Sequence, residues 1–205
     1  MGLHQGDSEQ RASHAKGAWT AAAMVGVLAI VIGLLGDAGR DWLAYERSAI
    51  AGGEYWRLLS AHFAHLGGSH LLLNLAGLLL IAYLVGAELS PGEWLVALVL
   101  ACLTVSIGLW VLLPDLEGYV GLSGVLHGLL AAGLLASAGR WGIDLWIVAV
   151  ALVAKLAYEQ LVGPLPSSEG LSGGNVIIDA HFYGAVSGCI TGASAAIRVR
   201  AQASI

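Results

Sequence analysis

The chain has 205 residues, of which 58% are apolar and 11% are charged. A soluble domain of this size needs more surface charge, so the composition indicates that a lipid bilayer is the solvent. The net charge of -5 is modest and the nine Lys and Arg residues are scattered, which argues against a nucleic-acid partner. Cys102 and Cys189 lie in apolar runs, where a thiol packs as a small hydrophobic group, so we expect no disulfide framework.

The chain begins with a polar segment, residues 1–17, followed by an apolar run that ends at Gly36. This run is longer than the apolar region of a signal peptide, and no clean A-x-A cleavage site closes it. We therefore expect residues 1–17 to be a cytoplasmic tail and the apolar run to be a retained membrane span. Residues 18–199 are predicted to form a single membrane domain.

Apolar runs of about 20 residues, the length that an α-helix needs to cross the hydrocarbon core, recur along the chain. They are separated by Gly, Pro and charged residues. The sequence therefore predicts an all-α, polytopic membrane protein, a bundle of six transmembrane helices. The predicted spans are residues 18–36, 70–87, 93–113, 120–138, 142–162 and 176–198.

The distribution of basic residues predicts an orientation. With both termini in the cytoplasm, five basic residues lie inside: Arg11, Lys16, Arg140, Arg198 and Arg200. Three lie outside, all in the 37–69 segment: Arg40, Arg47 and Arg57. The excess inside favours cytoplasmic termini, because long outer loops obey the positive-inside rule only weakly.

The long segment between the first two spans, residues 37–69, mixes aromatic and charged residues. Trp and Tyr prefer the depth of the lipid headgroups, so we interpret this segment as an interfacial loop. Trp56 and Arg57 are candidate anchors for it.

Polar side chains inside membrane spans are costly and ask for an explanation. Several occur at the start of the second, fourth and sixth spans, which all run in the same direction and so begin at the same depth under the outer face. They are His70, Asn74, Ser123, His127 and His181.

Ser123 lies in the string Gly121-Leu122-Ser123-Gly124, a fragment of a nucleophile site at a helix N-terminus. In a glycine-rich membrane protein the same string is also explained by helix packing through small residues. His181 shares one helical face with Gly184 and Gly188, and glycines on that face allow close approach of another helix. If that helix is the fourth span, His181 can accept the proton of Ser123.

No carboxylate completes a conventional triad by this reasoning. Asp179 is the only acidic residue close to His181 in sequence, but two positions along a helix correspond to a rotation of about 200°. We therefore expect a Ser123–His181 dyad. His70 and Asn74, at i and i+4, point the same way and are predicted to form an oxyanion hole with the Ser123 backbone N–H, or alternatively a polar contact between helices.

Lys155 and Glu159 are i and i+4 on the fifth span, and their simplest role is to neutralise one another. The functional alternative is that they line, together with Asp179, a pocket for substrate or for an acceptor amine. His62, His65 and His70 are close in sequence, which raises the alternative of a zinc site. Their spacing does not match H-E-x-x-H, and no glutamate lies between them, so we expect no metal and no cofactor.

The ordered set of Trp56-Arg57, His65, His70-x-x-x-Asn74, Gly121-x-Ser123-Gly124 and Ala180-His181-x-x-Gly184-x-x-x-Gly188 resembles the rhomboid intramembrane serine proteases over about residues 40–195. The resemblance implies a Ser123–His181 dyad, with His70 and Asn74 supporting the oxyanion and Trp56-Arg57 in the first loop.

At one position the chain departs from that family. His127 stands where rhomboid proteases commonly have an aromatic residue that packs on the catalytic histidine. Together with Lys155-x-x-x-Glu159-Gln160 and Asp179-Ala180-His181, this looks like the rhombosortase subfamily. That resemblance implies an inner-membrane enzyme, with its active site toward the periplasm. Its implied clients are secreted proteins with a C-terminal Gly-Gly anchor segment, and its implied acceptor is an amine, such as that of a lipid headgroup.

Three alternatives stay open at this point. The first is a general rhomboid protease that hydrolyses other transmembrane substrates, and the second is a non-catalytic, inactive-rhomboid-like protein that binds clients. The third, small-solute transport, would need paired broken helices or an internal repeat, and the sequence shows no such repeat.

Overall fold

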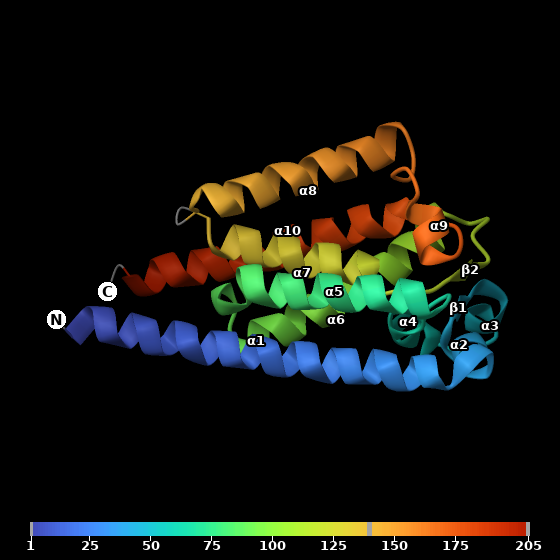
Figure 1. Ribbon diagram of the computed structural model, residues 1–205, viewed down its shortest axis with the longest axis horizontal. Coiled ribbons are helices and arrows are strands. Elements are labelled where there is room, and N and C mark those ends of the chain that lie inside the picture. Colours follow the sequence, from blue (N-terminus) through green and yellow to red (C-terminus); the bar gives the residue numbers. More distant parts are fainter. Residues whose placement is uncertain (1, 139–140, 204–205) are drawn as a thin grey trace.

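The computed structural model describes residues 2–138 and 141–203, and the described chain is mostly helical (Figure 1). Its long helices follow the order of the predicted apolar runs. They are α1 (Gly2–Leu34), α5 (Gly68–Val85), α6 (Pro91–Leu112), α7 (Ser123–Ala136), α8 (Ile143–Leu161) and α10 (Ile178–Ala203). The prediction of a helical fold is confirmed.

Three stretches of the described residues are long and apolar enough to cross a membrane: Ser8–Leu34, Gly68–Glu88 and Pro91–Leu112. Helix α7 is apolar but shorter, and α8 carries three charged residues. The count of six spans therefore stays a prediction. Residues 2–17, expected to be a tail, are helical and continuous with the first span. The 33 residues of α1 give a helix of about 50 Å, longer than the hydrocarbon core of about 30 Å.

Short elements gather at one end of the bundle, and both termini lie at the other (Figure 1). Strand β1 (Tyr45–Glu46) pairs antiparallel with β2 (Gly118–Tyr119), with Tyr45 opposite Tyr119. The other short elements at this end are α2 (Gly36–Leu43), α3 (Arg47–Ala51), α4 (Arg57–Ser60), η1 (Ala61–Phe63) and α9 (Ser168–Ser172). A further short element, η2 (Gly86–Glu88), connects α5 to α6 at the end with the termini.

Two arginines of the 37–69 segment hold these short elements in place. The guanidinium of Arg57 is buried and donates to the carbonyl oxygens of Asp41 and Ala44, at 2.8 Å each. Arg47 donates to four carbonyl oxygens at and beyond the C-terminal end of α6, those of Leu109, Trp110, Leu113 and Leu116. Helix ends leave carbonyl groups without partners, so one guanidinium here does the work of a cap.

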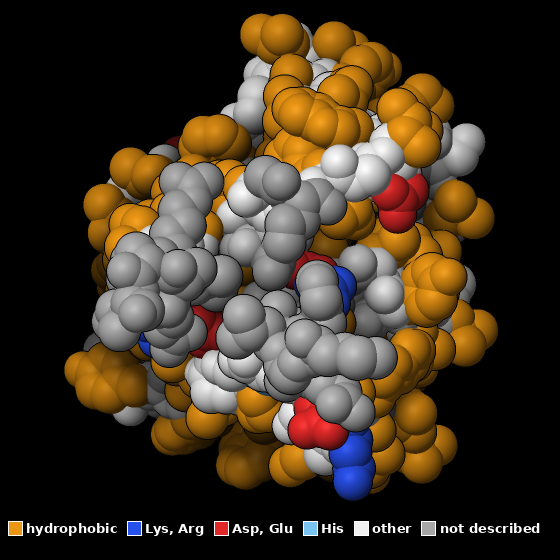
Figure 2. All heavy atoms as spheres, turned by 90° about the vertical axis from the view of Figure 1, so that its left-hand side faces the viewer, with side chains coloured by type: hydrophobic (Ala, Val, Ile, Leu, Met, Phe, Trp, Pro, Cys, Tyr) orange, Lys and Arg blue, Asp and Glu red, His pale blue; other side chains and the backbone are white. Residues whose placement is uncertain are grey.

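Ion pairs close the opposite end of the bundle. Arg11 of α1 pairs with Glu88, and Arg198 of α10 pairs with Glu93 of α6. In Figure 2, which looks at this end, hydrophobic side chains surround the outline of the molecule and charged side chains lie on the end itself. Of the basic residues predicted to lie on this side, Arg140 is outside the described residues, as is the side chain of Arg200.

Helices α7 and α10 touch through their backbones. A Cβ atom at Gly184 would overlap the carbonyl oxygen of Gly124, and one at Gly188 would overlap that of Gly128. The contact repeats one turn later, where Gly192 faces Ala132. A glycine at every fourth position therefore lets the two helices approach more closely than residues with a Cβ atom would permit.

Replacing Gly188 by Ala is expected to push the two helices apart. The added methyl meets backbone, which cannot rotate away, so we expect a loss of about 1–3 kcal/mol in the free energy of unfolding. Thermal unfolding of the protein in detergent measures it. Gly92→Ala is the matched control, because nothing lies within 4 Å of its Cβ position. Equal melting temperatures for the two variants would contradict this account of the contact.

Candidate active site

The N-terminal ends of α5, α7 and α10 lie together at the end of the bundle that carries β1 and β2 (Figure 1). Ser123 is the first residue of α7, and His181 lies in the first turn of α10. Ser123 Oγ is 2.9 Å from His181 Nε2. The His181 ring is buried, with 5% of the residue exposed, so its position is fixed by packing. A serine and a histidine from two distant helices can therefore share a proton.

The other ring nitrogen of His181, Nδ1, faces the carboxylate of Glu159, a contact that no spacing in the sequence predicts. Glu159 of α8 lies 2.9 Å from His181 Nδ1 through its Oε2, and only 2% of this residue is exposed. The second oxygen, Oε1, accepts from Lys155 Nζ at 2.6 Å. The expected Lys155–Glu159 pair does form, and it lies against the histidine. Lys155 Nζ is also 3.3 Å from His181 Nδ1.

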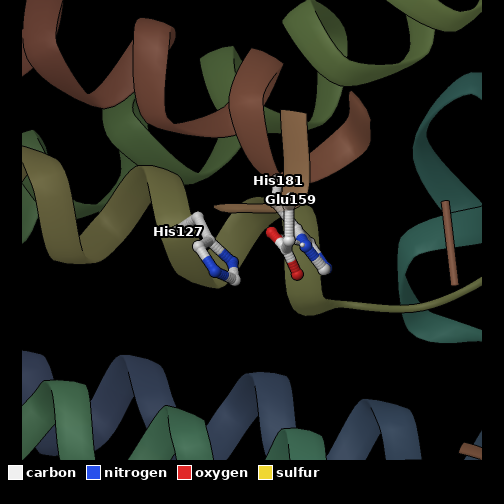
Figure 3. A group of neighbouring side chains, drawn as sticks. All are labelled: His127, Glu159 and His181. Carbon is white, nitrogen blue, oxygen red and sulfur yellow. Dashed lines mark hydrogen bonds and ion pairs between the residues drawn. The ribbon is translucent and has the colours of Figure 1, made fainter. Parts of the chain in front are cut away.

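His127 covers one face of the His181 ring. The two imidazoles stack with centroids 4.3 Å apart and planes 18° apart. His127 Nδ1 lies 2.7 Å from the carbonyl oxygen of Ser123, so its N–H donates one turn back along α7. His127, Glu159 and His181 come from three helices, α7, α8 and α10, and Figure 3 shows their side chains close together. The imidazole of His127 thus packs on the ring of His181.

His70 lies against the Ser123 loop, residues 120–122, which leads from β2 into α7 at Ser123. A Cβ atom at Gly121 would be 2.8 Å from His70 Nε2, and the backbone of Gly121 has φ of +125°. Position 121 therefore requires glycine for both reasons. Asn74 donates its amide to the carbonyl oxygen of His70, 3.2 Å away. Both residues line the same cavity as Ser123.

A cavity of about 760 Å³ opens onto the site. Ser123, His127, Lys155, Glu159 and His181 are among its polar lining residues, as are His70 and Asn74, and leucines of α5 and α7 line much of the rest. An apolar peptide segment fits such a lining. Asp179, predicted as a possible pocket residue, lies elsewhere, in a smaller hollow with Pro114 and Asp115.

The geometry also raises the question of a metal. Among the described residues, His127, Glu159 and His181 offer ligand atoms within 4.8 Å of one another. Both nitrogens of His181 are engaged, one by Ser123 and the other by Glu159. A metal ion would have to break one of these bonds. The arrangement therefore fits proton transfer better than it fits metal binding.

Two histidines considered for zinc have other surroundings. His62 contacts the carbonyl oxygen of Cys102 and the hydroxyl of Ser106, each at 3.0 Å. His65 packs edge to face on His70. Burial, with a smaller contribution from His70, lowers the pKa of His65 to about 4. Neither belongs to the metal-competent group found among the described residues.

A comparison with models of protein families finds the Rhomboid domain at residues 52–198. This match covers the Ser123 loop, all of α8 with its ion pair, and the part of α10 that faces α7. A comparison with curated proteins gave no match.

Proposed function

The chain belongs to the rhomboid family of intramembrane serine proteases, and we propose that it cleaves peptide bonds with Ser123 as nucleophile and His181 as general base. The observation that carries this proposal is the 2.9 Å contact between Ser123 Oγ and His181 Nε2. The family acts on transmembrane substrates within the bilayer, and the apolar cavity beside Ser123 has the size and lining for such a segment. The client-binding alternative does not require the hydroxyl and the imidazole to touch.

In the proposed reaction, Ser123 Oγ attacks the carbonyl carbon of the scissile bond while His181 Nε2 takes the hydroxyl proton. The carbonyl oxygen becomes an oxyanion. Ser123 begins α7, where backbone N–H groups lack helical partners and the helix dipole favours negative charge. His70, beside Gly121, is the proposed side-chain donor to the oxyanion. Asn74 supports His70 by donating its side-chain amide to the backbone carbonyl oxygen of His70. One such donor typically contributes about 3–4 kcal/mol.

We further propose that the site faces the periplasm from the inner membrane, with both termini in the cytoplasm. The termini and the site lie at opposite ends of the bundle (Figure 1). Arg11, Lys16 and Arg198 belong to the end with the termini, as the positive-inside rule requires.

The proposed clients are membrane-anchored proteins with a C-terminal Gly-Gly segment, as for a rhombosortase. Support comes from the residues that separate this chain from the general family pattern. His127 stacks on His181, and both Lys155 and Glu159 lie within hydrogen-bonding distance of it. Three of the distinguishing residues thus surround the base, whereas Asp179 lines a different hollow. An acyl-enzyme on Ser123 can be opened by water or by an amine acceptor, and both outcomes use the same first step.

Replacing Ser123 or His181 by Ala is expected to lower cleavage of a transmembrane client by at least about 10³-fold, because each removes a reacting group. Cleavage by purified protein in liposomes measures it, with thermal unfolding as the test of folding. Ser194→Ala is the control, since this serine is exposed on α10 and donates only to its own helix. Cleavage that persists in Ser123→Ala would remove the proposed nucleophile.

Mass spectrometry of a processed client tests the proposed substrate class. We expect a new C-terminus at the Gly-Gly segment, and no product from a client with Val-Val in its place. A bare carboxylate indicates hydrolysis, whereas the added mass of an amine indicates transfer. Equal cleavage of the Gly-Gly and Val-Val clients would show a general rhomboid protease instead.

A further inference from the structure

We propose that Glu159 is a positioning residue that completes a Ser123–His181–Glu159 triad, with Lys155 as its counter-ion. This inference rests on the proposed function, because it concerns the base of the same reaction. It replaces the dyad expected from sequence by three residues on three different helices, α7, α10 and α8. The evidence is the arrangement of bonds around the two ring nitrogens and the two carboxylate oxygens.

The bonds fix the tautomer of His181. For Nε2 to take the proton of Ser123, it must be unprotonated, and the ring hydrogen must then lie on Nδ1. Glu159 Oε2, 2.9 Å from Nδ1, is the acceptor that holds the hydrogen there. Lys155 is 3.3 Å from the same nitrogen but only 2.6 Å from Glu159 Oε1, so it donates to the carboxylate. Each carboxylate oxygen therefore has its own donor.

Lys155 explains how a carboxylate can remain charged in this place. Glu159 is 2% exposed, and an isolated buried carboxylate would take up a proton and lose its value as an acceptor. The ammonium group of Lys155, one helical turn away on α8, supplies the compensating charge. The side chain of Lys155 is 29% exposed, so it reaches the cavity and stays partly solvated.

A simple neutralising pair would not need this geometry. Lys155 alone satisfies one oxygen of Glu159, and the second oxygen could face solvent or another backbone donor. Instead it faces the one ring nitrogen that the reaction leaves unused. Asp179, two residues before His181, lines a different hollow. Of these two acidic residues, only Glu159 touches His181.

The role of Glu159 follows through both steps of acylation, which leave the acyl group on Ser123 Oγ. As the Oγ–carbon bond forms, the carbonyl electron pair moves to oxygen and the hydroxyl proton moves to His181 Nε2. The imidazolium then lies between the new oxyanion and the Glu159 carboxylate, which stabilises its charge without taking the proton. When the oxyanion collapses, the carbon–nitrogen bond breaks and Nε2 gives its proton to the leaving nitrogen. Glu159 is unchanged throughout.

The test compares Glu159→Gln with the matched control Glu169→Gln, an exposed glutamate on α9. The amide keeps the shape of the side chain but can turn its donor toward Nδ1 and favour the wrong tautomer. We expect kcat for a transmembrane client to fall by about 10²–10⁴-fold, with KM changed less than about threefold. Glu169→Gln is expected to match the wild type in both constants.

A second variant keeps the experiment decisive if Glu159→Gln does not fold. Glu159→Asp retains the charge that pairs with Lys155, but its carboxylate is one methylene further from His181. We expect an unchanged melting temperature and a kcat between those of the wild type and Glu159→Gln. Wild-type kcat in a folded Glu159→Gln or Glu159→Asp variant would overturn the triad. Loss of activity in Ser123→Ala would at the same time leave the proposed function intact, so the two failures are distinguishable.

Discussion

Ser123 and His181 are 58 residues apart in the chain, and the distance between them is set by the backbones of two helices. Helix α10 presents Gly184, Gly188 and Gly192 to α7, and each lies against a backbone carbonyl group. Side chains at these positions would increase the separation of the helices, and a proton cannot be shared across a gap even a few ångströms wider. The glycine face is therefore the constraint on which the proposed chemistry depends. In lipid, close packing of this kind replaces the hydrophobic effect as the attraction between helices.

The second constraint is electrical. Charged side chains are rare in the interior of a membrane protein, and this chain places a lysine and a glutamate on α8 at the level of the site. Their mutual bond lowers the cost of burying both, and the bond to His181 gives the glutamate a further partner. The polar groups of three helices thus satisfy one another, while the cavity beside them remains largely apolar. A peptide bond that enters this region meets a preorganised set of donors and acceptors.

Sequence reasoning predicted the helical class and the order of the apolar runs, because length and hydropathy are local properties. It also placed Ser123, His127 and His181 at one depth, because helix starts can be counted along the chain. It did not connect Glu159 with His181. Glu159 lies near the C-terminal end of α8. The direction in which its side chain points relative to α10 depends on tertiary packing, which no spacing in the sequence reports. The i, i+4 spacing predicts the Lys155–Glu159 pair, but a pair of opposite charges does not indicate a third partner.

The interfacial segment shows the same limit. The sequence makes Trp56 and Arg57 candidate anchors, but it does not indicate that Arg57 binds the carbonyl groups of Asp41 and Ala44, which lie 16 and 13 residues away along the chain. Arg47 was noted only for its charge, although it caps the end of α6 and contacts Trp110 through a cation–π interaction at 4.6 Å. Such contacts depend on how a loop folds back over the helices. They determine where the Ser123 loop lies, since β1 pairs with β2 just before it.

The central claim is that the hydroxyl of Ser123 is activated by His181, and covalent labelling tests it most directly. A fluorophosphonate reacts only with an activated serine, and peptide mapping by mass spectrometry locates the adduct. The account predicts an adduct on Ser123 in the wild-type protein and none in a folded His181→Ala variant. An adduct on a different serine, or equal labelling of Ser123 in both proteins, would contradict it.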